Sequence, residues 1–261
     1  MDLGLEGRTA LVLGASGGLG GAIAHALAAE GVQVACAGRN EAKTEATAEA
    51  IRAAGGKAMA VTWDLADIEV IPWVLTQVEG TFAPVDILIN NTGGPPPTTG
   101  SGQEPDLWRQ QFEAMVLSVI ALTDAVLPGM RERKWGRVIT STSSGVISPI
   151  PNLGLSNALR STLVGWSKTI SREIAKDGVT ANIVVPGRIA TARLSFLNEQ
   201  QAKREGRSVK EVEAAATAAI PSGRTGTPEE YANVVAFLAS ARASYITGSI
   251  VRVDGGLLQS I

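Results

Sequence analysis

The sequence predicts an α/β fold, in which a doubly wound parallel sheet carries helices on both faces. Short apolar runs alternate with longer helical stretches, and the runs are continuously apolar, as in strands that are buried on both faces. Glycine is frequent, with 29 residues, and a glycine-rich turn joins the first predicted strand to the first predicted helix. No linker, repeat or low-complexity tract interrupts the 261 residues, so we expect a single domain that spans residues 1–261.

Seven short apolar runs between turn residues predict the strands of this sheet. The first run ends at Gly14 and the second at Gly38. Helical segments separate successive runs, and such crossovers wind right-handedly and make neighbouring strands parallel. In chain order the predicted strands are residues 9–13, 32–37, 58–61, 85–90, 137–141, 180–185 and 249–253.

The longer stretches between these strands have the spacing and the boundary residues of helices. The first places Ile23 and Leu27 on one apolar face. The second is rich in alanine and glutamate and is followed by the stop signal Gly55-Gly56, and the third carries Pro72 in its first turn, where proline is tolerated. The predicted helices are residues 18–30, 41–54, 68–78, 106–133 and 155–175.

Composition and charge exclude several classes of protein. With 23 basic and 25 acidic residues the net charge is −2, so we expect neither a nucleic acid nor an anionic membrane as partner. The single cysteine and single histidine, Cys36 and His25, exclude a disulfide scaffold and make a metal site or a Ser-His-Asp triad improbable. No apolar run approaches the roughly 18 residues of a membrane span. The acidic N-terminus does not resemble a signal peptide, and we expect a soluble cytoplasmic protein.

The glycine-rich turn is the strongest functional motif in the sequence. Glycines at 14, 18 and 20 follow the first strand and open the first helix, in the spacing G-x-x-x-G-x-G. Glycine in this position permits a tight turn and lets backbone N–H groups approach a pyrophosphate at a helix N-terminus. A merely flexible loop is the alternative, but the strand–turn–helix context favours a nucleotide site. Its predicted contacts here are Gly14, Ser16, Gly18, Leu19 and Gly20.

The end of the second strand indicates which nucleotide is bound. Sheets that bind NAD usually carry an acidic residue there, which holds the ribose 2′-hydroxyl. This chain instead has Gly38-Arg39-Asn40, and Arg39 could pair with a 2′-phosphate. Arg39 could also be an ordinary exposed loop residue. We expect NADP rather than NAD as the cofactor, with Asp64, after the third strand, facing its adenine.

Four motifs, in order along the whole chain, resemble those of the short-chain dehydrogenase/reductase family: the glycine turn at 14–20, Asn-Asn-Thr-Gly at 90–93, Pro-Gly-Arg-Ile-Ala-Thr at 186–191 and Val-Asp-Gly-Gly at 253–256. The sequence is most similar to the 3-oxoacyl-acyl-carrier-protein-reductase-like members. The resemblance implies a Rossmann-type seven-stranded sheet, a nicotinamide cofactor and a homotetramer. It also implies further cofactor contacts at Asn90, Gly93, Pro186, Gly187, Ile189 and Thr191.

The chain departs from this family at the catalytic residues, which are Asn, Ser, Tyr and Lys. The family pattern places them on Met115, Ser143, Ser156 and Arg160, so that only the serine is kept. A serine hydroxyl is a far poorer acid and base than a lysine-activated phenol, and an arginine stays charged and does not shuttle protons. Tyr231 and Tyr245 lie far along the chain, and structural roles are the simpler interpretation for both.

Two interpretations of function follow from this departure. In the first, the protein is an NAD(P)H-dependent oxidoreductase of a carbonyl/alcohol pair, with a 3-oxoacyl compound as candidate substrate. Ser143 and Ser156 then polarise the carbonyl, Arg160 stabilises negative charge, and water supplies the proton. In the second, the chain is a catalytically impaired, cofactor-binding pseudoenzyme or regulatory subunit.

Two features allow more than one role under either interpretation. Arg160 could be a packed polar residue, or could hold the cofactor or an anionic substrate. The charged, alanine-rich insert at about 192–220 covers the substrate in the resembling family and could equally be a solvated helical pair.

Overall fold

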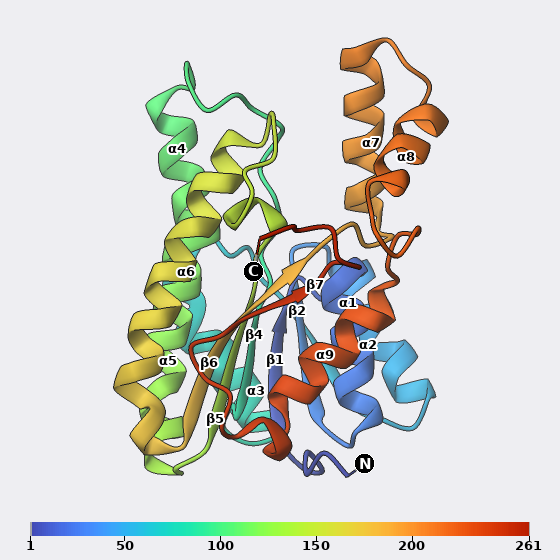
Figure 1. Cartoon of the computed structure of the whole chain (residues 1–261). Coiled ribbons are helices and arrows are strands. Elements are labelled where there is room, and N and C mark those ends of the chain that lie inside the picture. The colour runs from blue at the N-terminus through green and yellow to red at the C-terminus, as the bar shows by residue number, and fades with distance from the viewer. Residues whose placement is uncertain (1, 261) are drawn as a thin grey trace.

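The computed structural model describes residues 2–260, and its centre is a sheet in which every pair of neighbouring strands is parallel (Figure 1). The strand order is β3-β2-β1-β4-β5-β6-β7, which confirms the predicted seven-stranded, Rossmann-type arrangement. The order reverses between β1 and β4, and ligands bind at the carboxyl ends of the strands beside such a switch point. The strands are β1 (Thr9–Leu13), β2 (Gln33–Gly38), β3 (Lys57–Thr62), β4 (Ile87–Asn90), β5 (Gly136–Ser141), β6 (Val179–Pro186) and β7 (Ile250–Val253).

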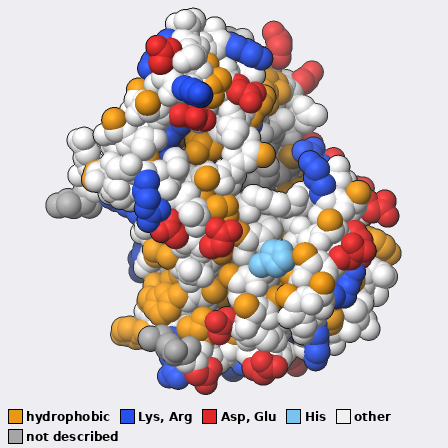
Figure 2. Space-filling view, turned by 90° about the vertical axis from the view of Figure 1, so that its right-hand side faces the viewer, with side chains coloured by type: hydrophobic (Ala, Val, Ile, Leu, Met, Phe, Trp, Pro, Cys, Tyr) orange, Lys and Arg blue, Asp and Glu red, His pale blue; other side chains and the backbone are white. Residues whose placement is uncertain are grey.

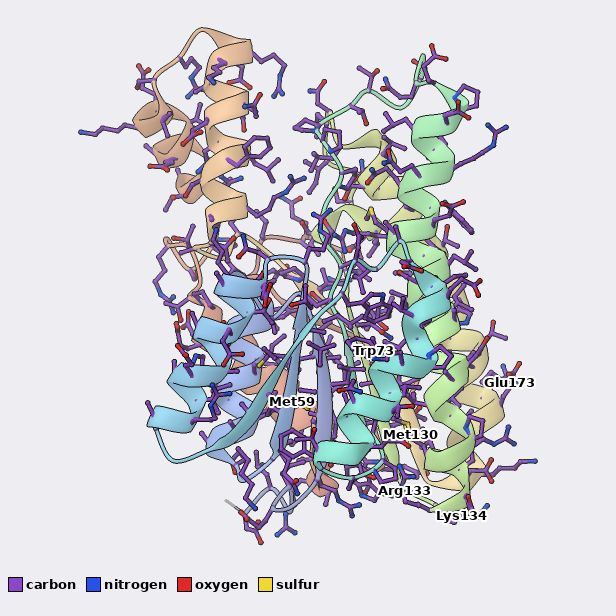
Figure 3. The ribbon with its side chains drawn as sticks, turned by 180° about the vertical axis from the view of Figure 1, so that it is seen from behind. Met59, Trp73, Met130, Arg133, Lys134 and Glu173 are labelled. Carbon is purple, nitrogen blue, oxygen red and sulfur yellow. The ribbon has the colours of Figure 1, made fainter. Side chains whose placement is uncertain are left out.

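Helices cover both faces of the sheet, and an apolar core fills each interface. One core joins β1 and β2 to α1 (Gly18–Ala29), α2 (Glu41–Ala53) and α9 (Pro228–Ala239). The other core joins the opposite face to α3 (Ile71–Thr81), α5 (Ser118–Glu132) and α6 (Gly154–Ile174). Figure 3 shows this second layer from behind, with Met130 of α5 on its inner side. The two-sided covering explains why the strands are apolar throughout rather than alternating.

Local signals fix where several helices begin. The side chain of Asn40 accepts a hydrogen bond from the backbone N–H of Lys43 (2.9 Å) and caps α2. Thr227 and Glu230 form a reciprocal capping box at the start of α9, with Pro228 in the first turn. The predicted third helix begins as a 3-10 turn at Ile68–Val70 and continues as α3, because Pro72 fits the first turn.

The long helix predicted for residues 106–133 contains an irregular turn. It consists of α4 (Pro105–Phe112), a π-helical turn at Glu113–Leu117 and α5. Met115 lies in the π turn and is buried with Leu155 and Leu159 of α6. By length and composition the stretch 105–132 would be apolar enough to cross a membrane, but here it packs on α6 and the sheet. The expectation that no segment spans a membrane stays a prediction.

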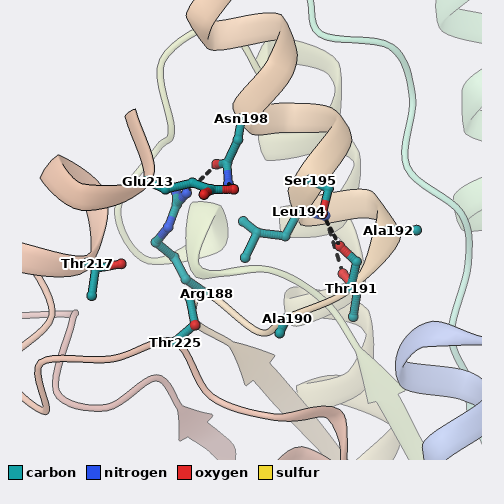
Figure 4. Close-up of a pocket in the computed structure, with 10 residues that line it drawn as sticks. All are labelled: Arg188, Ala190, Thr191, Ala192, Leu194, Ser195, Asn198, Glu213, Thr217 and Thr225. Atoms are coloured by element: carbon teal, nitrogen blue, oxygen red, sulfur yellow. Dashed lines mark hydrogen bonds between the residues drawn. The ribbon is translucent and has the colours of Figure 1, made fainter. Parts of the chain in front are cut away.

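The insert predicted at 192–220 forms two helices that project beyond the carboxyl ends of the strands (Figure 1). These are α7 (Ala192–Glu205) and α8 (Val209–Ala218), which pack against each other. Asn198 joins them to the segment after β6: it accepts a hydrogen bond from Arg188 and donates one to Glu213 (3.2 Å) (Figure 4).

Candidate functional site

The glycine turn between β1 and α1 is packed so tightly that two of its positions exclude any side chain. A Cβ on Gly14, whose φ is +64°, would lie 2.6 Å from the carbonyl oxygen of Asn91. A Cβ on Gly20 would lie 2.2 Å from the carbonyl oxygen of Gly14. The Asn91 side-chain amide donates to the carbonyl of Leu13 (3.2 Å) and holds the turn from the neighbouring β4 loop. The motif spacing alone had not assigned this role to Asn91.

Two other glycines of the turn, Gly17 and Gly18, are not crowded. Gly17 and Gly18 have φ values of +132° and +56°, and a Cβ on Gly17 would meet no atom within 4 Å. They line a hollow of about 410 Å³ together with Thr191, Glu229 and the single histidine, His25. Figure 2 shows the histidine on this face of the molecule. A compact backbone turn that opens onto a hollow at a helix N-terminus is the shape that a pyrophosphate needs. The predicted contacts Ser16 and Leu19 lie, half-buried, in the same turn.

The carboxyl ends of β2 and β3 meet beside this turn, where the adenosine half of a dinucleotide would bind. Arg39 is exposed directly after β2, and Gly38 packs against Ser16 and Thr44. The β3 end is tied to it, because the N–H of Trp63 donates to the carbonyl of Gly38 (3.1 Å). Asp64 is exposed on the following turn. The predicted arginine and aspartate therefore lie at adjacent strand ends, with no acid at the end of β2.

Buried polar atoms without partners lie at the carboxyl ends of β4 and β5. The side-chain amide of Asn90 donates to Thr123 (3.2 Å) and Thr140 (3.4 Å), and its Oδ1 is left unpartnered among the described residues. The hydroxyls of Thr92 and Thr142 are likewise buried without a partner within residues 2–260. Orphaned buried polar groups are costly, so each of them fits a place where water or a ligand completes the hydrogen bonding. Gly93 is exposed at the same edge.

The segment after β6 closes the hollow from the other side. The N–H of Gly187 donates to the carbonyl of Val253 (2.9 Å), and a Cβ there would lie 2.5 Å from Asp254 Cα. Ile189, three residues after Pro186, is buried, and Thr191 caps α7 by accepting from the N–H of Leu194 (3.3 Å). The Thr191 methyl lies 3.8 Å from where a Gly18 Cβ would be. Two predicted cofactor segments, distant in sequence, thus face each other.

The predicted catalytic serines lie near each other in the fold but share no hydrogen bond. Ser143 follows β5, and its hydroxyl accepts from the N–H of Gly145 (3.1 Å), which caps a short 3-10 turn at Ser144–Val146. Ser156 is buried on the first turn of α6, one helical turn before Arg160. Within the described residues Ser156 makes no side-chain hydrogen bond, so its hydroxyl is free to serve a ligand.

Arg160 carries a buried positive charge, and all of its hydrogen-bond partners are backbone carbonyl groups. Its guanidinium donates to the carbonyls of Ser141 (3.4 Å), Thr92 (3.3 Å) and Gly93 (2.9 Å), and the side chain is 8% exposed. Burial lowers the pKa of Arg160 to about 10, with the nearby charge of Arg193 acting in the same direction. It stays charged at neutral pH and holds the loop after β4 against the end of β5.

Neither tyrosine of the chain is placed as the acid that the family pattern predicts at position 156. Tyr231 of α9 is fully buried, and its single O–H proton is shared between the hydroxyl oxygen of Ser141 (2.8 Å) and the carbonyl of Val184 (3.3 Å). Burial raises the pKa of Tyr231, which suits a structural bond and not proton transfer. Tyr245 is fully exposed. At the position of the family's asparagine, Met115 lies in an apolar cluster that offers no path for a proton.

A second, polar pocket of about 440 Å³ lies under the insert (Figure 4). Arg188 and Asn198 line one side of it, and Thr191 and Leu194 the other. Sequence reasoning missed Arg193, in the first turn of α7, which donates to the carbonyl of Pro95 (2.7 Å) and joins the insert to the β4 loop. An arginine within an alanine-rich, charged helix has no pattern that would single it out. No metal-ligand cluster occurs within residues 2–260.

Comparisons with known proteins agree with this geometry. A family model described as enoyl-(acyl carrier protein) reductase matches residues 14–258. The 3-oxoacyl-[acyl-carrier-protein] reductase FabG of Escherichia coli is 37% identical over 257 residues, which cover 98% of this chain and 99% of that protein. The predicted likeness to 3-oxoacyl-acyl-carrier-protein reductases is thereby confirmed.

Two solved structures extend the likeness to the whole fold. L-sorbose reductase from Gluconobacter frateurii, complexed with NADPH and L-sorbose, is 31% identical with a TM-score of 0.94 and full coverage of both chains. YwfH, an NADPH-dependent reductase of bacilysin biosynthesis, is 31% identical with a TM-score of 0.92, covering 97% of this chain and 99% of that one. These relatives are reductases, and the NADPH in their descriptions agrees with the predicted choice of NADP.

Proposed function

This chain belongs to the short-chain dehydrogenase/reductase family of oxidoreductases, and we propose that it interconverts a carbonyl compound and its alcohol with NADP(H). The glycine turn is the observation that carries the proposal. Gly14 and Gly20 admit no side chain, while Gly17 and Gly18 open onto a hollow that Thr191 closes. The oxidoreductase relatives favour this function over a binding-only role. A 3-oxoacyl compound is the first substrate to try, because FabG of Escherichia coli is 37% identical.

The residues that would hold the dinucleotide form one continuous edge. The turn at 14–20 binds the pyrophosphate, and Arg39 and Asp64 lie where the adenosine half would be. Asn90 and Gly93 border the nicotinamide half from β4, and Pro186, Gly187, Ile189 and Thr191 border it from β6. Arg39 determines the preference for NADP over NAD. Its guanidinium pairs with a 2′-phosphate, and the end of β2 has no carboxylate that would repel this phosphate.

When bound, the nicotinamide supplies or accepts the hydride. The chain's part is to polarise the carbonyl and to stabilise the charge that develops on its oxygen. The hydroxyls of Ser143 and Ser156 donate to that oxygen, and the buried charge of Arg160 stabilises its negative charge. Water supplies the proton that completes the alcohol, since no phenol or lysine occupies the family's positions. General acid catalysis is worth roughly 10²–10⁴ in rate, so we expect a slow enzyme on unactivated ketones.

The coenzyme preference tests the cofactor half of this proposal. We expect wild-type protein to bind NADPH more tightly than NADH in a fluorescence titration. Arg39→Asp should invert the preference, because it removes the partner of the 2′-phosphate and adds a carboxylate for the ribose. Arg172→Asp is the matched control, because Arg172 is also exposed but lies in the last turn of α6. Equal affinities in wild type, or an unchanged preference in Arg39→Asp, would refute this assignment.

We propose further that the protein is a cytoplasmic homotetramer. β7 is an edge strand, so one side of its backbone is unpaired within the chain, and Ile250 on it and Phe237 of α9 are partly exposed. A second contact would use apolar faces of the two long helices, α5 and α6, across a two-fold axis. Light scattering at micromolar concentration should give four chains per particle, and a monomer would contradict the proposal.

A further inference from the structure

Two arginines hold the loop that follows β4. Arg160 of α6 donates to the carbonyl of Gly93 (2.9 Å), and Arg193 of α7 donates to the carbonyl of Pro95 (2.7 Å). Between them, a Cβ on Gly94 would lie 2.8 Å from the Arg193 guanidinium. The two charges are near enough for Arg193 to contribute to the lowered pKa of Arg160. Two cations, from α6 and α7, therefore lie at the β4 loop.

Neither arginine has an acidic partner. Among the described residues no carboxylate lies within 4.0 Å of either guanidinium, and residues 92–103 contain no acidic residue at all. Arg137, buried at the other end of β5, also donates only to carbonyls, but its guanidinium lies over the ring of Trp135 (4.4 Å). A buried cation that faces only carbonyl dipoles is costly, and an anion is what would relieve the cost.

The arginine pair lies beside the groups that would hold a reacting carbonyl. Arg160 is one helical turn from Ser156, and it contacts the carbonyl of Ser141, two residues before Ser143. The hydroxyls of Thr92 and Thr142 are buried there without partners within residues 2–260. A ligand that accepted hydrogen bonds from these hydroxyls and from the arginines would lie at the carboxyl ends of β4 and β5.

We propose that Arg160 and Arg193 bind an anionic group of the substrate, so that the preferred substrate is a short oxo acid with its carboxylate close to the reacting carbonyl. This inference rests on the proposed oxidoreductase function and narrows its substrate class. The carboxylate joins the two guanidiniums across the β4 loop, and the ketone oxygen faces Ser143 and Ser156. Because Arg193 belongs to the insert, the bound anion also ties α7 to the sheet edge.

The test compares acids with their neutral esters. Pyruvate, acetoacetate and 2-oxoglutarate are each paired with the methyl ester, and reduction is followed by NADPH absorbance. Binding of each compound is also measured by calorimetry, with and without NADP⁺. Wild type should favour the acids in kcat/KM and affinity by about ten- to a hundredfold, the size of a charge-assisted hydrogen bond. Arg193→Gln should remove this preference, and Arg193→Lys should keep most of it.

Arg204→Gln is the control, because Arg204 lies on the same helix with an exposed side chain that contacts Glu205 (3.7 Å) and not the β4 loop. It should leave both the acid preference and the NADPH affinity unchanged. Equal use of acids and esters by wild type, or a preference that survives Arg193→Gln, overturns the inference. So does an Arg193→Gln protein that loses NADPH affinity as much as acid affinity, because the charge would then serve the cofactor. A wild type that binds the acids but not NADPH would instead overturn the proposed function.

Discussion

The two halves of the sheet's carboxyl edge are built in different ways. On the β1–β2 side, the site is made of backbone: Gly14 and Gly20 leave no room for a Cβ, and Gly17 and Gly18 adopt positive φ. On the β4–β6 side, the site is made of side chains, chiefly Ser143, Ser156 and Arg160. The first half has the glycine motif of its family, whereas the second, by the alignment predicted from the sequence, keeps one of the family's four catalytic residues.

This difference indicates that a backbone binding turn can stay the same in a fold while the catalytic side chains change. A backbone turn is fixed by sterics, so its glycines are needed for any ligand that binds there. The side chains at the predicted catalytic positions are each held by local contacts. Arg160 fills its place with three bonds to carbonyls, and Met115 fills the asparagine position with apolar contacts. We therefore expect cofactor binding and proton transfer to be separable in this chain.

The largest effect is expected when the family's acid is restored on the side-chain half of the site. The double variant Ser156→Tyr with Arg160→Lys returns a phenol with a lysine beside it, in the spacing the family uses. Activity on neutral ketones should rise by about 10²–10⁴, the contribution of a general acid. The control is Ser156→Phe with Arg160→Lys, which adds the ring without the hydroxyl and should give no gain. Equal activity in the two double variants would mean that the missing phenol does not limit the rate.

The next largest effect is expected from Ser143→Ala. If the Ser143 hydroxyl donates to the substrate oxygen, its loss should cost about 2–4 kcal/mol of transition-state stabilisation, measured as kcat/KM. Ser144→Ala is the neighbouring control, because Ser144 is buried in the same turn and makes no side-chain hydrogen bond within the described residues. A rate unaffected by Ser143→Ala would assign the hydroxyl only to capping, where it accepts from Gly145.

Alanine substitutions at two helical glycines test the half of the site that is made of backbone. Gly20→Ala places a Cβ 2.2 Å from the Gly14 carbonyl oxygen, whereas Gly165→Ala in α6 meets nothing within 4 Å. We expect Gly20→Ala to destabilise the fold by about 1–3 kcal/mol or more and to weaken NADPH binding. Gly165→Ala should stabilise it by about 0.5–1 kcal/mol, because alanine favours helix. Thermal unfolding and a NADPH titration measure both. Normal NADPH binding by Gly20→Ala would contradict the steric account of the turn.

The smallest effect concerns the tyrosine beneath the site. Tyr231→Phe removes the bond to Ser141 and should cost about 0.5–1.5 kcal/mol of stability at neutral pH, with NADPH binding unchanged. The pKa of Tyr231 is raised by burial, so the folded state favours the protonated phenol. Its stabilisation is fully present below the unfolded value of about 10 and is lost as pH rises above it. Denaturant unfolding should therefore show the gap between wild type and Tyr231→Phe shrinking above pH 10. A constant gap would refute the titration argument.

The fold was predictable from the sequence because its signals are local. Continuous apolar runs such as 9–13 and 180–185 mark strands buried on both faces, and both fall in the observed sheet. The π turn at Glu113–Leu117 was not predictable, because the apolar spacing continues through it without a break. It depends on how Met115 packs against α6, which is a tertiary contact.

Within the site, residues in glycine and strand-end motifs were predictable, and those that act through contacts between elements were not. Asn91 lies in a predicted motif, but its bond to Leu13 comes from the neighbouring strand. Arg193 has no sequence signature, and its part appears only when α7 is brought to the β4 loop. Tyr231 lies 90 residues from Ser141 along the chain, so the bond between them was not visible in the sequence.

Transfer of a labelled hydride tests the central claim, that this edge reduces carbonyls without a tyrosine. Wild-type protein is incubated with NADPH that carries deuterium in place of both hydrogens on the transferring carbon, in one reaction with acetoacetate and in another with a 3-oxoacyl thioester. Mass spectrometry of the alcohol should show one deuterium on the former carbonyl carbon, at a rate above that without protein and greatly reduced in Ser143→Ala. If the protein binds NADPH but no deuterated alcohol forms from either substrate, the account is contradicted. The protein would then bind the cofactor without using it.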